Sequence, residues 1–219
     1  MYQNGFKRWF DLWAGTTGFV LCLPVIAVLA VLIRVTMGGP VLFRQERPGL
    51  GGERFYIFKF RTMTDARNRN GTLLSDDSRL TRLGRFLRGT SLDELPELIN
   101  VLKGEMSLVG PRPLRVEYLD YYTPDEARRH DVRPGITGWS QVNGRNAVDW
   151  PTRLKQDVWY VDNMSFWLDL KILFLTVVKV FRREGISAEG HATMPSFVEW
   201  AKREGRSPST GSGQGEVRS

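Results

Sequence analysis

Two adjacent carboxylates, Asp93 and Glu94, lie in the densest run of chemically capable residues in the chain. Arginines flank them, with Arg88 upstream and Arg112 downstream. Helix N-termini attract phosphate, and arginine binds phosphate oxygens through paired N–H groups. A carboxylate pair can hold Mg²⁺ or attack phosphorus. The pattern therefore predicts a diphosphate site at the start of a helix over residues 91–102.

The same residues also fit a purely structural role. Ser91 followed by Glu94 has the spacing of a capping box, in which both side chains bond to backbone N–H groups of the first helical turn. Asp93 in that turn would interact favourably with the helix dipole. Pro96 is tolerated there because first-turn N–H groups have no partner within the helix. Spacing favours the cap and the surrounding arginines favour phosphate chemistry, and the two roles are compatible.

Four further residues are candidates with plainer alternatives. Lys59 and Arg61 lie at the end of a predicted strand, where such a pair can bind phosphate or simply solvate a sheet edge. Arg145 follows an Asn-Gly pair that fits either a turn or a nucleotide contact. Asp157 falls in a predicted helix over 151–163, where an acid is usually exposed or salt-bridged.

The element that carries Lys59 is predicted to be a β-hairpin. Residues 41–46 and 55–60 are rich in aromatic and β-branched side chains, and a Pro-Gly-Leu-Gly-Gly turn over 48–52 separates them. The glycines do not form a phosphate-binding loop, because no Gly-Lys-Ser/Thr follows them.

The remaining elements are predicted to be mainly helical. We expect helices over 80–88, 91–102, 116–130, 151–163 and 166–181, and a glycine-containing loop or short strand over 134–145. The segment 166–181 is amphipathic, and it fits either packing on the core or lying in lipid headgroups. From residue 203 the composition turns to Ser, Gly and Arg, which predicts a disordered tail over 203–219.

An uncharged, largely apolar segment runs from Leu12 to Ile33. As a helix it would be about 33 Å long, enough to cross a bilayer core. A cleaved signal peptide is disfavoured because no small-residue cleavage site follows Ile33. A straight transmembrane helix and a helix that enters and leaves one leaflet both remain.

Two features favour the re-entrant helix, which we expect over residues 1–36. Pro24 stands in the middle of the segment, where it removes a backbone hydrogen bond and kinks the helix. Both flanks are basic, with Lys7 and Arg8 before the segment and Arg34 after it. Positive charge on both sides indicates that both ends face the cytoplasm.

Composition sets broad limits on function. The 219 residues are 42% hydrophobic and 25% charged, which excludes a disordered chain and a polytopic membrane protein. A net charge of +7 favours an anionic partner. A single cysteine, Cys22, excludes an intrachain disulfide framework and, with only two histidines, argues against a zinc site.

Four stretches, taken in order, resemble one family over about residues 5–195. They read FDLWAG…LPVIAVLAVLIR, GGPVLFRQERPGLGGERFYIFKFRTM, TRLGRFLRGTSLDELPELINVLKGEMSLVGPRPL and RHDVRPGITGWSQVNGRN. The family is that of the bacterial sugar transferases, the monotopic polyprenol-phosphate phosphoglycosyl transferases. The short length, the start MYQNGFKRWFD and the run HDVRPGITG resemble, more narrowly, the transferase of diacetylbacillosamine phosphate in bacterial N-glycosylation.

The resemblance implies an α+β fold: a small, mostly helical catalytic domain with a β-hairpin over 37–202, interfacial amphipathic helices, and the re-entrant helix before it. It implies transfer of a sugar-1-phosphate from a UDP-sugar to undecaprenyl phosphate, with release of UMP and a requirement for Mg²⁺. Such a reaction begins the assembly of a glycoprotein glycan, O-antigen, capsule or exopolysaccharide at the cytoplasmic face of the bacterial inner membrane.

The resemblance also implies residue roles. Asp93 forms a covalent acyl-phosphate, and Glu94 assists in metal binding or proton transfer. Lys59, Arg88 and Arg112 would stabilise phosphoryl oxygens. Arg145 is our candidate for the uridine side and Asp157 for a supporting role at the substrate.

Membrane placement follows from the same resemblance. The basic residues Lys7 and Arg8, the kink at Pro24 and the net positive charge would hold the catalytic helix at an anionic leaflet. One position departs from the family pattern, because relatives often carry Ser before the kink proline and this chain has Leu23. Pro24 alone must then redirect the helix.

A rival hypothesis is a non-enzymatic, membrane-tethered scaffold that binds anionic lipids through its basic surface. It would release no UMP from UDP-sugars, and Asp93→Asn would leave it unchanged. Nucleic-acid binding is disfavoured because the arginines cluster around acids and no basic stripe with interleaved aromatics occurs.

Overall fold

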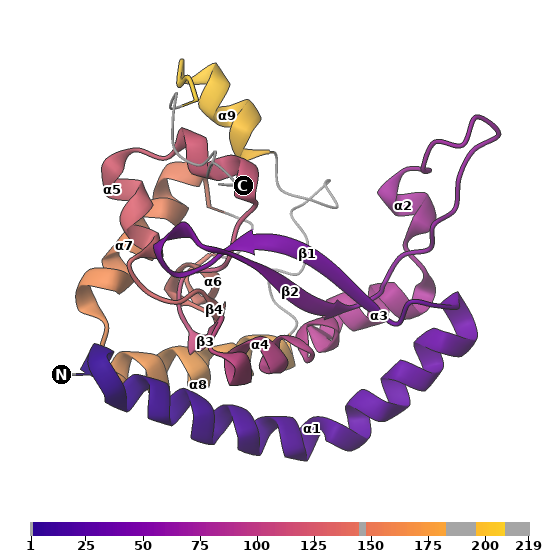
Figure 1. Ribbon diagram of the computed structural model, residues 1–219, viewed down its shortest axis with the longest axis horizontal. Helices are drawn as coiled ribbons and strands as arrows, with labels where there is room; N and C mark the ends of the chain where they lie inside the picture. Colours follow the sequence, from indigo (N-terminus) through magenta and orange to yellow (C-terminus); the bar gives the residue numbers. More distant parts are fainter. Residues whose placement is uncertain (1, 145–147, 183–195, 209–219) are drawn as a thin grey trace, which may run out of the picture.

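The computed structural model describes residues 2–144, 148–182 and 196–208. It is a mostly helical α+β fold with two small sheets. After an irregular turn over Tyr2–Phe6, the long helix α1 (Lys7–Met37) runs along one edge of the molecule, and the rest of the described chain lies on its concave side (Figure 1).

The predicted hairpin is confirmed. Strands β1 (Leu42–Pro48) and β2 (Arg54–Phe60) pair antiparallel, and a 3₁₀ turn over Leu50–Gly52 lies between them. Alternation along β2 directs Phe55 and Ile57 toward the interior, where they form a buried cluster with Val101 and Met106. The hairpin thus rests on the helix that follows the acidic pair.

A second sheet was not expected from the sequence. Strands β3 (Ser107–Val109) and β4 (Gly135–Thr137) pair in parallel. A Cβ atom at Gly135 would lie 2.0 Å from the backbone nitrogen of Gly110, so only glycine permits this approach. The predicted loop or short strand over 134–145 contains β4 and the one-turn helix α6 (Trp139–Val142).

The predicted helix over 80–88 is confirmed as α3 (Arg82–Thr90), and the one over 91–102 is broken into two parts. Helix α3 ends because Ser91 adopts the left-handed conformation, with φ 57°. A 3₁₀ turn over Leu92–Glu94 follows, and α4 (Glu97–Lys103) then begins after Pro96. The acidic pair therefore lies on a turn between two helices instead of in the first turn of one.

A single helix over 116–130 is wrong. The segment forms a 3₁₀ helix over Val116–Tyr121, the short helix α5 (Pro124–Ala127) and a 3₁₀ turn over Arg128–His130. The reason is local, because proline excludes the residue before it from the helical region, and Thr123 instead caps α5.

The helices α7 (Trp150–Asn163) and α8 (Phe166–Arg182) confirm two predictions. They enclose a core with the small sheet, in which Tyr160, Ile172 and Val109 are buried. The short helices α2 (Asp76–Arg79) and α9 (Phe197–Arg203) complete the described chain.

The predicted tail begins too early. Arg203 is the last residue of α9, and Arg206 pairs with both carboxylate oxygens of Glu126, at 2.7 and 3.0 Å. Residues 209–219 of the predicted tail lie outside the described residues.

Helix α1 continues through Pro24 and is bent (Figure 1). It is the one helix of the described residues that is long and apolar enough to cross a membrane. It is buried only near its two ends, at Lys7, Asp11 and Gly15 and again at Leu29 and Ile33. The middle of α1 presents its apolar side chains outward.

Candidate active site

The carboxylates Asp93 and Glu94 lie on the turn between α3 and α4, and the predicted capping box does not form there. Ser91 makes no side-chain cap, because its left-handed backbone departs from the extended conformation of an N-cap residue. The Glu94 side chain is consequently available for contacts inside the protein.

Glu94 is held by two cations from distant elements. Its Oε1 atom accepts a hydrogen bond from Lys59 Nζ on β2 at 2.6 Å and one from Arg112 Nη2 at 2.5 Å. Burial alone would raise the pKa of Glu94, but Arg112 and Lys59 outweigh it and hold that pKa well below its ordinary value. Glu94 is therefore an anion with a fixed orientation at neutral pH.

Asp93 lies in a different environment. Its side chain is buried, and among the described residues it has no hydrogen-bond or ion-pair partner. Burial and the charge of Glu94 raise the pKa of Asp93, against the opposing effects of Lys59, Arg112 and Arg88. Adjacent acids with pKa values displaced in opposite directions are suited to different roles.

A third carboxylate, Glu97, belongs to the same cluster and was not singled out from the sequence. It lies in the first turn of α4, is 1% exposed, and pairs through Oε1 with Lys59 Nζ at 3.0 Å. Burial, aided by Glu94 and opposed by Lys59, raises the pKa of Glu97 to about 7. Its spacing of three residues from Glu94 was the available signal, because such residues share a helix face.

Arg88 is fixed beside the acids by the packing of α3 on the end of β2. Its Nε donates to Thr62 Oγ1 at 3.1 Å. One turn earlier, a Cβ atom at Gly84 would lie 1.9 Å from the carbonyl oxygen of Thr62, so glycine permits the close approach. The structure thus brings together four of the predicted site residues with Lys59: Asp93, Glu94, Arg88 and Arg112.

Asp157 does not take the predicted position at the substrate. It is 1% exposed, and its two oxygens accept hydrogen bonds from Ser140 and Arg129, each at 2.7 Å. Arg129 in turn donates to the backbone carbonyl of Arg112 at 2.7 Å. Asp157 therefore helps to position the backbone of Arg112 through Arg129. Both of its oxygens already accept hydrogen bonds from protein groups.

More positive charge gathers next to Arg112 than the sequence indicated. Burial, with the charges of Arg112 and Arg115, lowers the pKa of Arg47 to about 10. Arg153 lies over the ring of Trp150, with 5.4 Å between the guanidinium carbon and the ring centroid. This surplus of guanidinium groups suits a polyanionic ligand. The remaining predicted site residue, Arg145, lies outside the described residues.

Asp93 and Glu94 could supply two carboxylate ligands to Mg²⁺, but the described residues do not provide a complete set of protein ligands. Among the described residues, no group of three or more His, Cys, Asp or Glu side chains is placed to hold a metal ion. Mg²⁺ usually binds one or two carboxylates together with substrate phosphates and water. The Asp93 carboxylate and the second oxygen of Glu94 meet that requirement, since the described contacts of Glu94 use Oε1.

The two basic residues expected to face the membrane surface are used inside the protein. Lys7 is buried and pairs with Asp169 of α8 at 2.5 Å. Arg8 donates to the backbone carbonyls of Val101 and Leu102 at the end of α4, at 2.7 and 3.1 Å. The charge of Lys7 is paired with a carboxylate, and the guanidinium of Arg8 is bound to backbone carbonyls of α4.

Known proteins resemble this chain along most of its length. Residues 2–183 match the family described as bacterial sugar transferase. The sugar transferase EpsL of Bacillus subtilis is 55% identical over 88% of this chain and 95% of its own length. The UDP-glucose:undecaprenyl-phosphate glucose-1-phosphate transferases of Klebsiella pneumoniae and Escherichia coli are 43% and 42% identical, each over 80% of this chain.

The chain spans about two fifths of the length of those two glucose-1-phosphate transferases, 40% in each case. The matched region of this chain contains the acidic pair, the hairpin that carries Lys59, and Arg112. With a family match over residues 2–183 and a relative of nearly equal length at 55% identity, the chain belongs to the bacterial sugar transferase family.

Proposed function

We propose that this transferase moves a sugar-1-phosphate from a UDP-sugar to undecaprenyl phosphate and releases UMP, as the first membrane step of glycan assembly. The names of the relatives from Klebsiella pneumoniae and Escherichia coli describe this reaction for glucose. The observation that carries the proposal is the buried Asp93 carboxylate, which has no described partner beside a Glu94 held by Lys59 and Arg112.

The reaction we propose has two steps at one phosphorus atom. An oxygen of Asp93 attacks the β-phosphorus of the UDP-sugar, so an Asp93 O–P bond forms, the bond to the α-phosphate oxygen breaks, and UMP leaves. A phosphate oxygen of undecaprenyl phosphate then attacks the same phosphorus and breaks the bond to Asp93. The two substrates never need to be bound together, which suits one soluble donor and one lipid acceptor.

We assign supporting roles in both steps to the neighbours of Asp93. Arg88 and Arg112, which bind Thr62 and Glu94 beside it, would stabilise negative charge on the phosphoryl oxygens. Lys59 binds Glu94 and Glu97 together and so keeps the acidic face of the site in one arrangement. We propose Asp93 and Glu94 as the residues that hold Mg²⁺, which when bound offsets the charge of the departing UMP.

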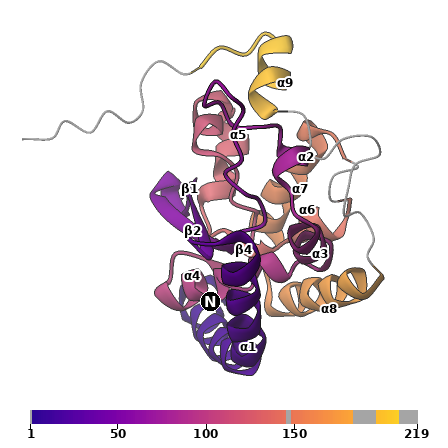
Figure 2. The ribbon, with the colours of Figure 1, turned by 90° about the vertical axis from the view of Figure 1, so that its right-hand side faces the viewer.

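Placement at a lipid surface is part of the proposal. The first half of α1 and α8 lie at the same edge of the molecule (Figure 2). These two helices expose large apolar and aromatic side chains: Trp9 59%, Trp13 58%, Leu21 73%, Trp167 77% and Phe174 68%. Tryptophan favours the boundary between headgroups and hydrocarbon. Such a surface supports an interfacial role for the outer face of α8 while its inner face packs on the core.

We propose that α1 is re-entrant, with both ends on the cytoplasmic side of the bacterial inner membrane. Near its start, Gly15 packs on Val101 of α4, and near its end, Ile33 packs in a cluster with Leu87 of α3. Both ends thus contact one catalytic domain, whereas a straight span would carry one end to the opposite face. In this proposal, the membrane topology of α1 is set mainly by the contacts of its two ends with the catalytic domain, and less by free basic residues beside it.

The decisive experiment separates enzyme from lipid-binding scaffold. Purified protein in nanodiscs is incubated with Mg²⁺ and a panel of UDP-sugars: UDP-glucose, UDP-galactose, UDP-N-acetylgalactosamine and UDP-diacetylbacillosamine. We expect UMP release with one of them and, without lipid acceptor, a phospho-sugar adduct on the peptide that contains Asp93. The sugar that reacts assigns the donor.

Asp93→Asn is the matched variant, since it keeps the size of the side chain and removes the nucleophilic oxygen charge. We expect loss of at least about a thousandfold in transfer, because a covalent nucleophile is removed. Equal turnover in the Asn variant, or UMP release that requires the acceptor and leaves no adduct, would overturn the two-step mechanism.

A further inference from the structure

The first turns of α1 carry an unusual set of buried polar groups for a helix that faces lipid. Lys7 and Asp11 are 7% and 2% exposed, and with Gly15 they are spaced by four residues, so they share one face. That face points at the catalytic domain. Burial of charged groups is costly unless each is paired, so these contacts specify one arrangement of α1 on the domain.

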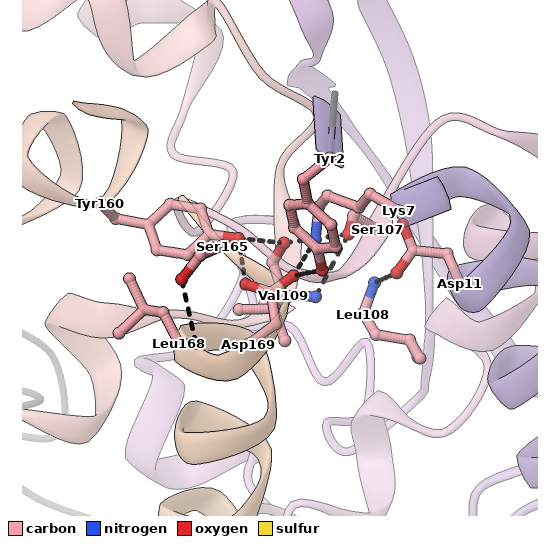
Figure 3. A network of polar contacts seen from close by, with 10 residues as sticks. All are labelled: Tyr2, Lys7, Asp11, Ser107, Leu108, Val109, Tyr160, Ser165, Leu168 and Asp169. Atoms are coloured by element: carbon pink, nitrogen blue, oxygen red, sulfur yellow. Dashed lines mark hydrogen bonds and ion pairs between the residues drawn. The ribbon is translucent and has the colours of Figure 1, made fainter. Parts of the chain in front are cut away.

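Asp11 binds the strand that leads to Arg112. Its Oδ1 accepts a hydrogen bond from the backbone N–H of Leu108, at 3.0 Å (Figure 3). From the other side, the hydroxyl of Tyr160 on α7 lies 3.1 Å from the carbonyl oxygen of Val109 and shares its single proton between this carbonyl and the Asp169 carboxylate. Strand β3 is therefore fixed from two sides, and Gly110 and Pro111 alone separate it from Arg112.

Arg8 binds the helix that follows the acidic pair. It donates to the carbonyls of Val101 and Leu102 in the last turn of α4, and the Val101 carbonyl also accepts from the N–H of Gly104. A cation at the C-terminal end of a helix also interacts favourably with the helix dipole. A Cβ atom at Gly15 would lie 3.2 Å from Val101 Cγ1, so α1 and α4 are in close contact. Because α4 has seven residues, a shift at its end moves its start as well.

Asp169 of α8 keeps this part of α1 in register. Its Oδ2 accepts from Lys7 Nζ and from the hydroxyl of Tyr2, each at 2.5 Å, and its Oδ1 accepts from Tyr160 at 2.6 Å. Figure 3 shows these side chains converging from α1, α7 and α8 next to β3. Removing one partner of such a buried pair leaves an uncompensated charge, so the network resists rearrangement.

We infer that the start of α1 is a positioning element for catalysis, in which Asp11 sets Arg112 through β3 and Arg8 sets the acidic pair through α4. This inference rests on the proposed function of Arg112 and Asp93. Neither Asp11 nor Arg8 touches the reacting atoms in this assignment; each acts through the backbone it binds. A role in anchoring alone would affect only the step that uses the lipid acceptor.

The donor half-reaction distinguishes the two roles, because it needs no lipid acceptor. The rate of phospho-sugar adduct formation on Asp93 is measured in nanodiscs by rapid quench and mass spectrometry for Asp11→Ala, Asp11→Asn and Thr17→Ala. Thr17 is the control on α1, since within the described part of the chain its hydroxyl bonds only to the carbonyl of Trp13 in its own helix. Vesicle co-flotation and far-UV circular dichroism are recorded for each variant.

We expect Asp11→Ala to slow the maximal rate of adduct formation about tenfold to a hundredfold, with vesicle binding unchanged, because small displacements of a catalytic group cost this much. Asp11→Asn keeps an acceptor oxygen for Leu108 and should recover most of the rate. Thr17→Ala should match the parent. An unchanged adduct rate in Asp11→Ala, with the loss confined to the lipid step or to flotation, would overturn the inference.

A second variant guards against misfolding of Asp11→Ala. Arg8→Lys keeps a cation at the end of α4 but cannot reach both carbonyls in the same forked geometry. We expect a smaller loss of adduct rate with native circular dichroism, and a rate equal to the parent would contradict the inference. An adduct that persists in Asp93→Asn would instead refute the proposed function, whatever the Asp11 variants do.

Discussion

At the scale of single residues, the site separates two neighbouring carboxylates by the partners each one receives. Glu94 is bound by Lys59 and Arg112, which lie on separate elements, whereas Asp93 has no partner among the described residues. Covalent attack on phosphorus requires an oxygen that is not already committed to a cation. Glu97 adds a third acid whose protonation is set by burial.

The raised pKa of Glu97 predicts a pH-dependent contribution to folding stability. Its folded pKa is about 7 against an ordinary value of 4.5, so between these values the folded protein binds the proton more tightly than the unfolded chain does. The stabilisation is complete below the ordinary pKa and is lost as pH rises through about 7. Glu97→Gln does not titrate and should be free of this loss.

We therefore expect the melting temperature of Glu97→Gln, relative to the parent, to rise by about 5 °C between pH 5 and pH 8. Thermal unfolding in detergent at both pH values measures the difference. Glu105→Gln is a suitable control, because Glu105 is a partly exposed acid that pairs with Lys103. If the melting temperatures of the Glu97 variant and the parent change in parallel with pH, the pKa of Glu97 is not raised by folding.

At the scale of elements, two identical capping patterns behave differently. Thr123 and Glu126 form a complete capping box at α5, whereas Ser91 and Glu94, with the same spacing, do not. The difference is the backbone of Ser91, which ends α3 in the left-handed region before the 3₁₀ turn begins. Breaking the helix there turns Glu94 inward to Lys59 and Arg112.

The left-handed backbone of Ser91 predicts a stabilising substitution. With φ 57° and no side-chain cap, Ser91→Gly should raise the free energy of unfolding by about 1 kcal/mol, because glycine adopts this conformation without steric cost. Ser75→Gly is the matched control: Ser75 has φ −56° and hydrogen-bonds to Ser78, so glycine there should destabilise. Urea unfolding measures both, and a loss of stability in Ser91→Gly would contradict the argument.

At the scale of the whole molecule, α1 both closes the catalytic domain and presents an apolar surface. Its two ends are buried against α4 and α3, and its middle is exposed between them. An exposed apolar stretch of this length is unfavourable in water but favourable in hydrocarbon. If the middle of α1 is embedded as proposed, the same helix connects the membrane surface to the elements that carry the site.

A charge in the middle of α1 should weaken membrane association. Leu21 is 73% exposed, and Leu21→Glu would place an ionised group in hydrocarbon at a cost of about 2–4 kcal/mol. We expect a clear fall in the fraction that floats with phosphatidylglycerol vesicles. Val35→Glu, at a 78% exposed position near the end of α1, should float like the parent. Equal flotation of both variants would show that the middle of α1 is not embedded.

Features that depend on neighbours along the chain could be predicted from residue order alone. The hairpin, α7, α8 and the apolar helix follow from residue pattern and length, and the acidic pair was found because it stands in a motif with its arginines. At 116–130 the signal against a single helix is itself local, because Pro124 excludes Thr123 from the helical region, whereas no local pattern indicates the left-handed backbone of Ser91.

Which charged side chains are paired within the protein could be seen only in the tertiary structure. Lys7 and Asp169 are 162 positions apart, and Lys59 and Glu94 are 35 apart, so no local pattern connects them. Residue type makes Asp157 a candidate for the substrate, but its two oxygens accept hydrogen bonds from Ser140 and Arg129. Residue type gives a side chain its chemistry, but burial and partners brought by distant elements determine whether that chemistry is open to a ligand or used to hold the fold.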